Sequence, residues 1–145
     1  MSKDIGARVL SIAESWIGTP YRHQGATKGV GCDCLGLVRG IWRELYGEEP
    51  ERPAAYATDW AERDGEERLI GAAYRHFGSA LPADRMRPGD LLLFRWRPDC
   101  VAKHAGIFCG GEHFIHAYEQ SAVVRSPLAP AWRRKIAGAF RFPDG

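Results

Sequence analysis

Cys34 stands at a position where a thiol can act as a nucleophile. The chain carries four cysteines, and this one falls at the expected first turn of a helix that begins at Asp33-Cys34 and runs to Tyr46. Unpaired backbone N–H groups and the helix dipole at such a position favour a thiolate over a thiol. The same N–H groups can donate to the oxyanion of a tetrahedral intermediate. A buried structural cysteine is the commoner case, so a catalytic role for Cys34 requires a base nearby.

Two histidines on predicted neighbouring strands supply a candidate base. In segment 103–107, apolar residues alternate with His104, which places the imidazole on the opposite face of the strand. His116 lies in the next strand, and a turn at Gly110-Gly111 would pair the two. Simple hairpin numbering puts His104 opposite residue 117, and a one-residue bulge would correct this offset. We therefore expect His104 to take the thiol proton and His116 to fix its orientation and tautomer.

The elements that must position these residues are helices first and strands afterwards. Helical spacing of apolar residues predicts three helices, over residues 4–17, 33–46 and 59–77, with Asp4 as a candidate cap of the first. The periodicity then changes to short β-branched and aromatic segments separated by turn residues. The expected strands are 90–95, 103–109, 113–118, 122–126 and 136–142. This order predicts an α+β fold with an antiparallel sheet.

Composition limits the class of protein. The 145 residues fit a single domain, 1–145, with 45% hydrophobic and 26% charged residues. The net charge of +2 is too small and too evenly spread to indicate nucleic-acid binding. The N-terminus lacks the apolar core of a secretory signal, and no apolar segment is long enough to span a bilayer. We expect synthesis in the cytoplasm, no membrane insertion, and four cysteines that are all thiols.

A set of motifs resembles, in order, those of the NlpC family of peptidoglycan peptidases. The opening motifs are Trp16-Ile17-Gly18-Thr19-Pro20-Tyr21-Arg22 and Gly31-Cys32-Asp33-Cys34-Leu35-Gly36-Leu37-Val38. Arg87-Pro88-Gly89-Asp90-Leu91-Leu92-Leu93-Phe94 is similar to the Pro-Gly-Asp start of the family's sheet. His104-Ala105-Gly106-Ile107-Phe108 and Phe114-Ile115-His116-Ala117 resemble its two histidine strands, and segment 133–141 resembles its closing strand. The resemblance covers nearly the whole chain.

The resemblance implies a papain-like fold, with N-terminal helices packed on a C-terminal antiparallel sheet of five to six strands. It also implies hydrolysis of amide bonds in the stem peptides of bacterial peptidoglycan, with no cofactor and no metal. Cys34 matches the family's nucleophile, His104 its base and His116 its third polar residue. Tyr21 matches a tyrosine whose hydroxyl lines the site and can stabilise the oxyanion. Asp33 matches an acidic residue that meets the free amine of a stem peptide in some members; a purely structural role as a helix N-cap is the alternative, and both stay open.

The chain also departs from the family's pattern. Leu35 stands where many members have a serine, Cys32 takes a place that is usually apolar, and segment 48–82 is longer than in compact members and could form a lid or an attachment surface. No wall-binding repeat or export signal accompanies the domain. These features resemble the short members encoded among phage tail or gene-transfer-agent genes. On that basis we expect phage-like tail proteins as partners and particle-borne delivery to the periplasm or cell wall.

Three other hypotheses stay open. Cys32, Cys34, His104 and His116 are enough ligands for zinc, although the C-x-C spacing and the expected helix turn the two thiols apart. A phage-tail assembly or structural protein could retain the fold with little catalysis, against which the intact Cys, His, His and Tyr set argues. A thiol amidase or acyltransferase acting on a substrate outside the wall would share the thioester mechanism. Chelation and thiol alkylation separate the first of these from a cysteine hydrolase.

Overall fold

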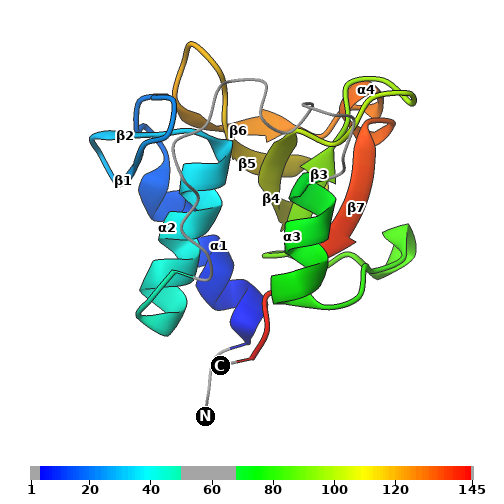
Figure 1. Cartoon of the computed structure of the whole chain (residues 1–145), viewed down its shortest axis with the longest axis horizontal. Coiled ribbons are helices and arrows are strands. Elements are labelled where there is room, and N and C mark those ends of the chain that lie inside the picture. The colour runs from blue at the N-terminus through cyan, green and yellow to red at the C-terminus, as the bar shows by residue number, and fades with distance from the viewer. Residues whose placement is uncertain (1–3, 50–67, 145) are drawn as a thin grey trace.

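The structure is a computed structural model that describes residues 4–49 and 68–144. Three helices on one side of a five-stranded antiparallel sheet form its main layers (Figure 1). The helices are α1 (Ile5–Trp16), α2 (Cys34–Tyr46) and α3 (Arg68–Phe77), followed later by the short α4 (Pro130–Arg133) and a 3₁₀ turn, η2 (Ala83–Arg85). The sheet strands are β3 (Leu91–Phe94), β4 (His104–Gly110), β5 (His113–Ala117), β6 (Val123–Pro127) and β7 (Ile136–Phe140), in the order β6-β5-β4-β3-β7. The α+β, papain-like expectation is confirmed.

Alternation along the strands divides the core between the two faces of the sheet. Odd-numbered residues such as Leu91, Leu93 and Ile107 pack against the helices. Even-numbered residues such as Leu92 and Phe94 form a second cluster on the opposite face. A period of two is what a pleated strand imposes on its side chains. Because His104 and His116 are even-numbered members of β4 and β5, their rings lie beside the aromatic residues of this second cluster, such as Phe114 and Trp132.

A close approach of α1 and α2 sets the helix layer. Trp16 is 1% exposed, and its indole lies against Gly40, where an added Cβ would overlap the ring. The indole N–H donates to Glu44 Oε2 at 2.7 Å, which satisfies its polar atom as α1 ends. Glycine at position 40 therefore allows the two helices to come together, and α2 is held in a fixed position over the sheet.

Several predicted elements are confirmed, with differences at their ends. The helix predicted over 33–46 is observed at Cys34–Tyr46, and Gly47 ends it with a φ of 86°. Of the helix predicted over 59–77, residues 68–77 are helical and the rest lies outside the described residues. Asp4 occupies the N-cap position of α1, as expected, but its side chain makes no cap hydrogen bond. The expected bulge between the histidine strands is present, between Phe108 and Gly110.

Four short elements were not predicted: β1, β2, the 3₁₀ turn η2 and α4. Strands β1 (Ala26–Thr27) and β2 (Gly31–Cys32) form a small hairpin within the glycine-containing loop before α2. The short helix α4 follows β6 and places Trp132 against the second face of the sheet. Within the described part of the chain, no helix has the length and apolar character needed to cross a membrane.

Candidate active site

Cys34 occupies the first position of α2, held by a capped helix start. Asp33 is the N-cap: its Oδ1 accepts from the Gly36 N–H at 2.7 Å, and its Oδ2 accepts from the Gln24 N–H at 2.8 Å. Gly36 is required there, because a Cβ would overlap the carbonyl oxygen of Gly25. The structural role expected of Asp33 is thus observed, although Asp33 also borders the pocket described below. An ammonium-binding role stays a prediction.

The two histidines are directly hydrogen bonded. His104 Nε2 and His116 Nδ1 lie 2.8 Å apart, and the side chains are 7% and 1% exposed. In the β4–β5 register, the pairs Ile107–Ile115 and Phe108–Phe114 carry both histidines to the same face of the sheet, one diagonal step apart. The bulge at the hairpin end produces this register. The expected contact between His104 and His116 is present, but the expectation that a bulge brings them directly opposite is wrong, because the register makes them diagonal neighbours.

Aromatic rings enclose the histidine pair. Trp96 stacks on His104 with a centroid separation of 5.4 Å and an interplanar angle of 26°, and Trp132 lies 5.3 Å from the His116 ring. Phe114 stacks on the same His116 ring at 4.2 Å. These rings contribute to the burial of both histidines. The sequence offered no signal for this enclosure, since Trp96 and Trp132 lie on separate loop and helix segments.

Burial decides the protonation states of the catalytic candidates. Burial raises the pKa of the Cys34 thiol to about 12, with the Asp33 charge adding to the rise, while backbone N–H groups of Ala105 and Leu35 oppose it. Burial, and secondly the neighbouring His116, lower the pKa of His104 to about 3. The resting pair is therefore a neutral thiol and a neutral imidazole. Loss of solvation thus opposes the thiolate that the helix start was expected to favour.

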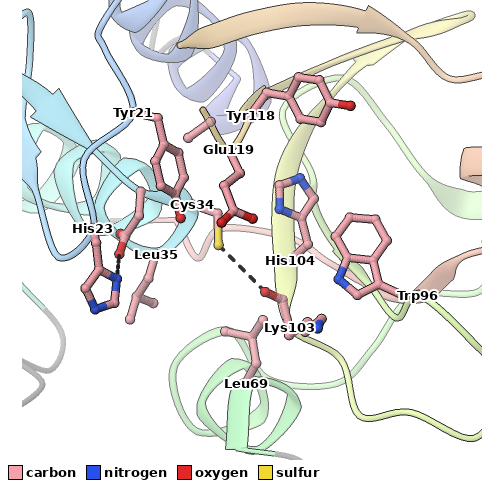
Figure 2. A pocket seen from close by; sticks show the side chains of 12 residues that line it. Tyr21, His23, Cys34, Leu35, Leu69, Trp96, Lys103, His104, Tyr118 and Glu119 are labelled. Atoms are coloured by element: carbon pink, nitrogen blue, oxygen red, sulfur yellow. Dashed lines mark hydrogen bonds and ion pairs between the residues drawn. The ribbon is translucent and has the colours of Figure 1, made fainter. Parts of the chain in front are cut away.

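A pocket joins the nucleophile and the base. Figure 2 shows Tyr21 on one side of Cys34, His104 and Trp96 on the other, and Glu119 drawn between Tyr21 and His104. The Cys34 thiol donates to the Lys103 carbonyl oxygen at 3.9 Å, beside the start of β4. This arrangement places a soft nucleophile, a base and a phenol around one opening.

The Tyr21 side chain lines this pocket, and a phenolic hydroxyl can donate a hydrogen bond. Burial, followed by repulsion between ionised Tyr21 and the ionised forms of Cys34 and Asp33, raises the pKa of Tyr21 above its usual value. The hydroxyl therefore keeps its proton at neutral pH. Tyr21, predicted from the sequence, lines the pocket as expected, and Glu119, Trp96 and Lys103 line it without having been predicted. Glu119 had no recognisable spacing signal, because it lies in the turn after β5.

The zinc hypothesis can be compared with the placement of the described His and Cys side chains. Among residues 4–49 and 68–144, no group of three or more His, Cys, Asp or Glu side chains is placed to hold a metal ion. Cys32 is fully buried in β2, and Cys34 faces the pocket one residue beyond the hairpin. The zinc hypothesis needed these two thiols and both histidines on one centre, and they are not grouped in that way.

With this geometry in place, the comparisons with known proteins identify the family. A model of the NlpC/P60 family matches residues 18–141. The chain belongs to the NlpC/P60 family. The match extends from the end of α1 to the residue after β7, so all the candidate site residues lie within it.

Relatives of this NlpC/P60 domain include longer proteins. The chain is 30% identical over 139 residues to the murein DD-endopeptidase MepS/murein LD-carboxypeptidase of Escherichia coli K12. That match covers 95% of this chain but 63% of the relative, so the chain spans less than two thirds of its length.

Solved structures show the same fold. The NlpC/P60 domain of the peptidoglycan hydrolase SagA has a TM-score of 0.64 at 22% identity, covering 94% of this chain and 98% of that one. RipD from Mycobacterium tuberculosis, described as a non-catalytic NlpC/P60 domain protein, has a TM-score of 0.58 at 16% identity, covering 97% and 98%. The fold is therefore compatible with proteins that do and do not catalyse a reaction.

Proposed function

We propose that this domain is a cysteine peptidase that hydrolyses amide bonds in the stem peptides of bacterial peptidoglycan. The observation that carries the proposal is the pocket in which Cys34 at a helix start meets His104, itself hydrogen bonded to His116. The name of the E. coli relative, a murein endopeptidase, supports peptidoglycan as the substrate class. Tyr21 supports acyl chemistry because its protonated hydroxyl lies in the same pocket.

The reaction begins from the neutral pair. As Cys34 Sγ attacks the substrate carbonyl carbon, the thiol proton passes to the free Nδ1 of His104, and the carbonyl π electrons move onto oxygen. The His104 Nε2–H remains hydrogen bonded to His116, which stabilises the imidazolium that forms. The oxyanion accepts hydrogen bonds from backbone N–H groups at the start of α2 and from the Tyr21 hydroxyl.

Two further steps complete the turnover. The tetrahedral intermediate collapses, the C–N bond breaks, and the leaving nitrogen takes the proton from His104, which yields an amine and a Cys34 thioester. Water then attacks the thioester while His104 accepts its proton. Collapse of this second intermediate breaks the C–S bond, releases the carboxylic acid and returns the proton to Sγ. No cofactor enters these steps.

The decisive experiment is digestion of purified peptidoglycan, with the products read by mass spectrometry. The wild type is expected to release new stem-peptide fragments, which identify the bond, and Cys34→Ala is expected to release none. Cys109→Ala is the matched control, since this thiol lies towards the far end of β4, outside the pocket, where it contacts the Ile107 carbonyl and the Arg125 side chain. Products from Cys34→Ala equal to those of the wild type would contradict the proposal.

Two alternatives predict different outcomes of the same digestion. A phage-tail assembly or structural protein that retains the fold would release no fragments in either the wild type or Cys34→Ala. RipD is an example of a non-catalytic protein with this fold. A thiol amidase or acyltransferase acting outside the wall would also release none, but would retain a Cys34 that forms an acyl adduct with small activated esters. The pocket containing Cys34, His104 and Tyr21 favours the peptidase.

Delivery by a phage-like particle is the remaining part of the proposal. The resemblance to short members that accompany tail proteins supports it. An immunoblot of particles purified from the source culture is expected to detect this chain. Its absence from the particle fraction would contradict particle-borne delivery to the periplasm or cell wall.

A further inference from the structure

The hydrogen-bonded chain that begins at the base does not end at His116. His116 Nε2 lies 2.8 Å from the hydroxyl oxygen of Ser126 on β6. In the β5–β6 register, His116 faces Val124 and Phe114 faces Ser126, so the hydroxyl reaches the imidazole along a diagonal of the same sheet face. Both nitrogens of His116 therefore have partners, His104 on one side and Ser126 on the other.

Protonation of His104 fixes the direction of this chain. When His104 carries the proton from Cys34, both of its ring nitrogens are donors, so His116 Nδ1 must be an unprotonated acceptor. A neutral His116 then carries its hydrogen on Nε2. Because His116 is only 1% exposed, that N–H needs an acceptor within the protein. The Ser126 hydroxyl oxygen is the group at hydrogen-bonding distance. A hydroxyl can also donate, so it is the imidazolium state of His104 that makes Ser126 an acceptor.

The opposite tautomer of His116 would stop the reaction. With hydrogen on Nδ1, His116 would donate to His104 Nε2, and a neutral His104 would then carry its own hydrogen on Nδ1. That nitrogen could no longer accept the Cys34 proton. The charge state of His116 agrees with the working direction, because burial lowers its pKa to about 4 and keeps the ring neutral at physiological pH.

We propose that Ser126 is a positioning residue whose hydroxyl accepts from His116 Nε2–H, holds His116 in the tautomer that accepts from His104, and leaves His104 Nδ1 free to take the thiol proton. The inference deepens the proposed peptidase function and rests on it. Ser126 acts through two intervening rings and touches neither the nucleophile nor the substrate. A roughly three- to tenfold change in rate corresponds to about 0.6–1.4 kcal/mol, which is the size expected for loss of one neutral hydrogen bond.

The test compares Ser126→Ala with Ser126→Thr, which keeps a hydroxyl on the same strand. Ser15→Ala is the matched control, because it removes a serine hydroxyl that bonds only within α1. Peptidoglycan digestion is expected to show kcat lowered roughly three- to tenfold by Ser126→Ala, with KM unchanged, and restored by Ser126→Thr. Equal loss in the Ala and Thr variants would overturn the proposal, since it would indicate packing and not the hydroxyl.

A second readout does not depend on the substrate. Nitrogen-15 NMR of the imidazoles in the unliganded protein is expected to show His116 protonated on Nε2 in the wild type and in Ser126→Thr, and a mixture of tautomers in Ser126→Ala. An unchanged His116 tautomer in Ser126→Ala would overturn the role of Ser126. If the wild type cleaves no peptidoglycan but the tautomer shift occurs, the proposed function fails and the assignment of Ser126 is supported.

Discussion

At the scale of single residues, the nucleophile and the base of the site are both uncharged at rest. Cys34 and His104 both lie where charge is poorly solvated, so the thiol pKa rises to about 12 and the imidazole pKa falls to about 3. Proton transfer at rest is therefore unfavourable, and it becomes favourable only when charge develops on a bound carbonyl next to the α2 start and Tyr21. A resting thiol is also less exposed to oxidation and alkylation than a thiolate.

The alkylation rate of Cys34 should therefore depend steeply on pH. Below a pKa of about 12 the thiolate fraction grows tenfold per pH unit, so the rate with iodoacetamide is expected to rise tenfold per unit between pH 6 and pH 10. Mass spectrometry of the Cys34 peptide separates this rate from that of the other thiols. A rate independent of pH above about 5 would show a resting thiolate–imidazolium pair, and would contradict the neutral state.

The two histidines should differ in the cost of their removal. His104→Ala removes the proton acceptor and is expected to lower kcat by about 10²–10⁴-fold. His116→Ala leaves the His104 ring in place between Trp96 and Trp132 and removes only its orienting partner. Its loss should be smaller when both variants are assayed on peptidoglycan under one set of conditions. A larger loss for His116→Ala would mean that the two roles have been exchanged.

At the scale of elements, the sequence predicted those helices and strands whose bounds depend on residues close together in the chain. The start of α2 at Cys34 followed from Asp33 and the apolar spacing behind it, and the histidine strands followed from alternation around Gly110-Gly111. Ser126 could not be predicted as a partner of His116, because the contact depends on the β5–β6 register and not on spacing within either strand. The aromatic enclosure by Trp96 and Trp132 was unpredictable for the same reason, since it joins segments far apart in the chain.

The packing of α1 on α2 gives a test of the helix layer. Gly40→Ala would drive a methyl group into the Trp16 indole, and the indole is held by its hydrogen bond to Glu44, so the helices must separate. A loss of about 1–3 kcal/mol in the free energy of unfolding is expected, which exceeds the helix-propensity gain of about 1 kcal/mol from replacing glycine.

The matched control for this variant lies on α3. Gly71→Ala places its methyl group 3.7 Å from an Arg75 side-chain nitrogen, which is ordinary van der Waals contact, and should stabilise the protein by up to about 1 kcal/mol. Urea unfolding of both variants measures the difference. Equal stability of Gly40→Ala and Gly71→Ala would show that the Trp16 contact does not restrain α2.

At the scale of the whole molecule, one buried carboxylate connects the start of the sheet to the end of the chain. Asp90 is 1% exposed and precedes β3, and its two oxygens accept from Arg141 Nε and Nη2, each at 3.0 Å. Its Oδ2 also accepts from the Arg87 N–H at 2.7 Å. The Pro-Gly-Asp motif thus has a structural role, because Asp90 binds Arg141 and so holds the segment after β7 next to the turn that precedes β3. Neither Asp90 nor Arg141 lines the pocket around Cys34.

Asp90→Asn should therefore weaken folding without changing the chemistry. Loss of hydrogen bonds between a carboxylate and a guanidinium is expected to lower the free energy of unfolding by about 1.5–3 kcal/mol. Glu14→Gln is the matched control: it breaks the Arg125–Glu14 ion pair, whose side chains are 43% and 48% exposed, and should cost less than about 1 kcal/mol. Urea unfolding gives both values, and peptidoglycan digestion below the unfolding transition gives kcat per folded molecule. A fall in kcat with unchanged stability would place Asp90 in the catalytic site, whereas the geometry assigns it to the contact between the start of β3 and the segment after β7.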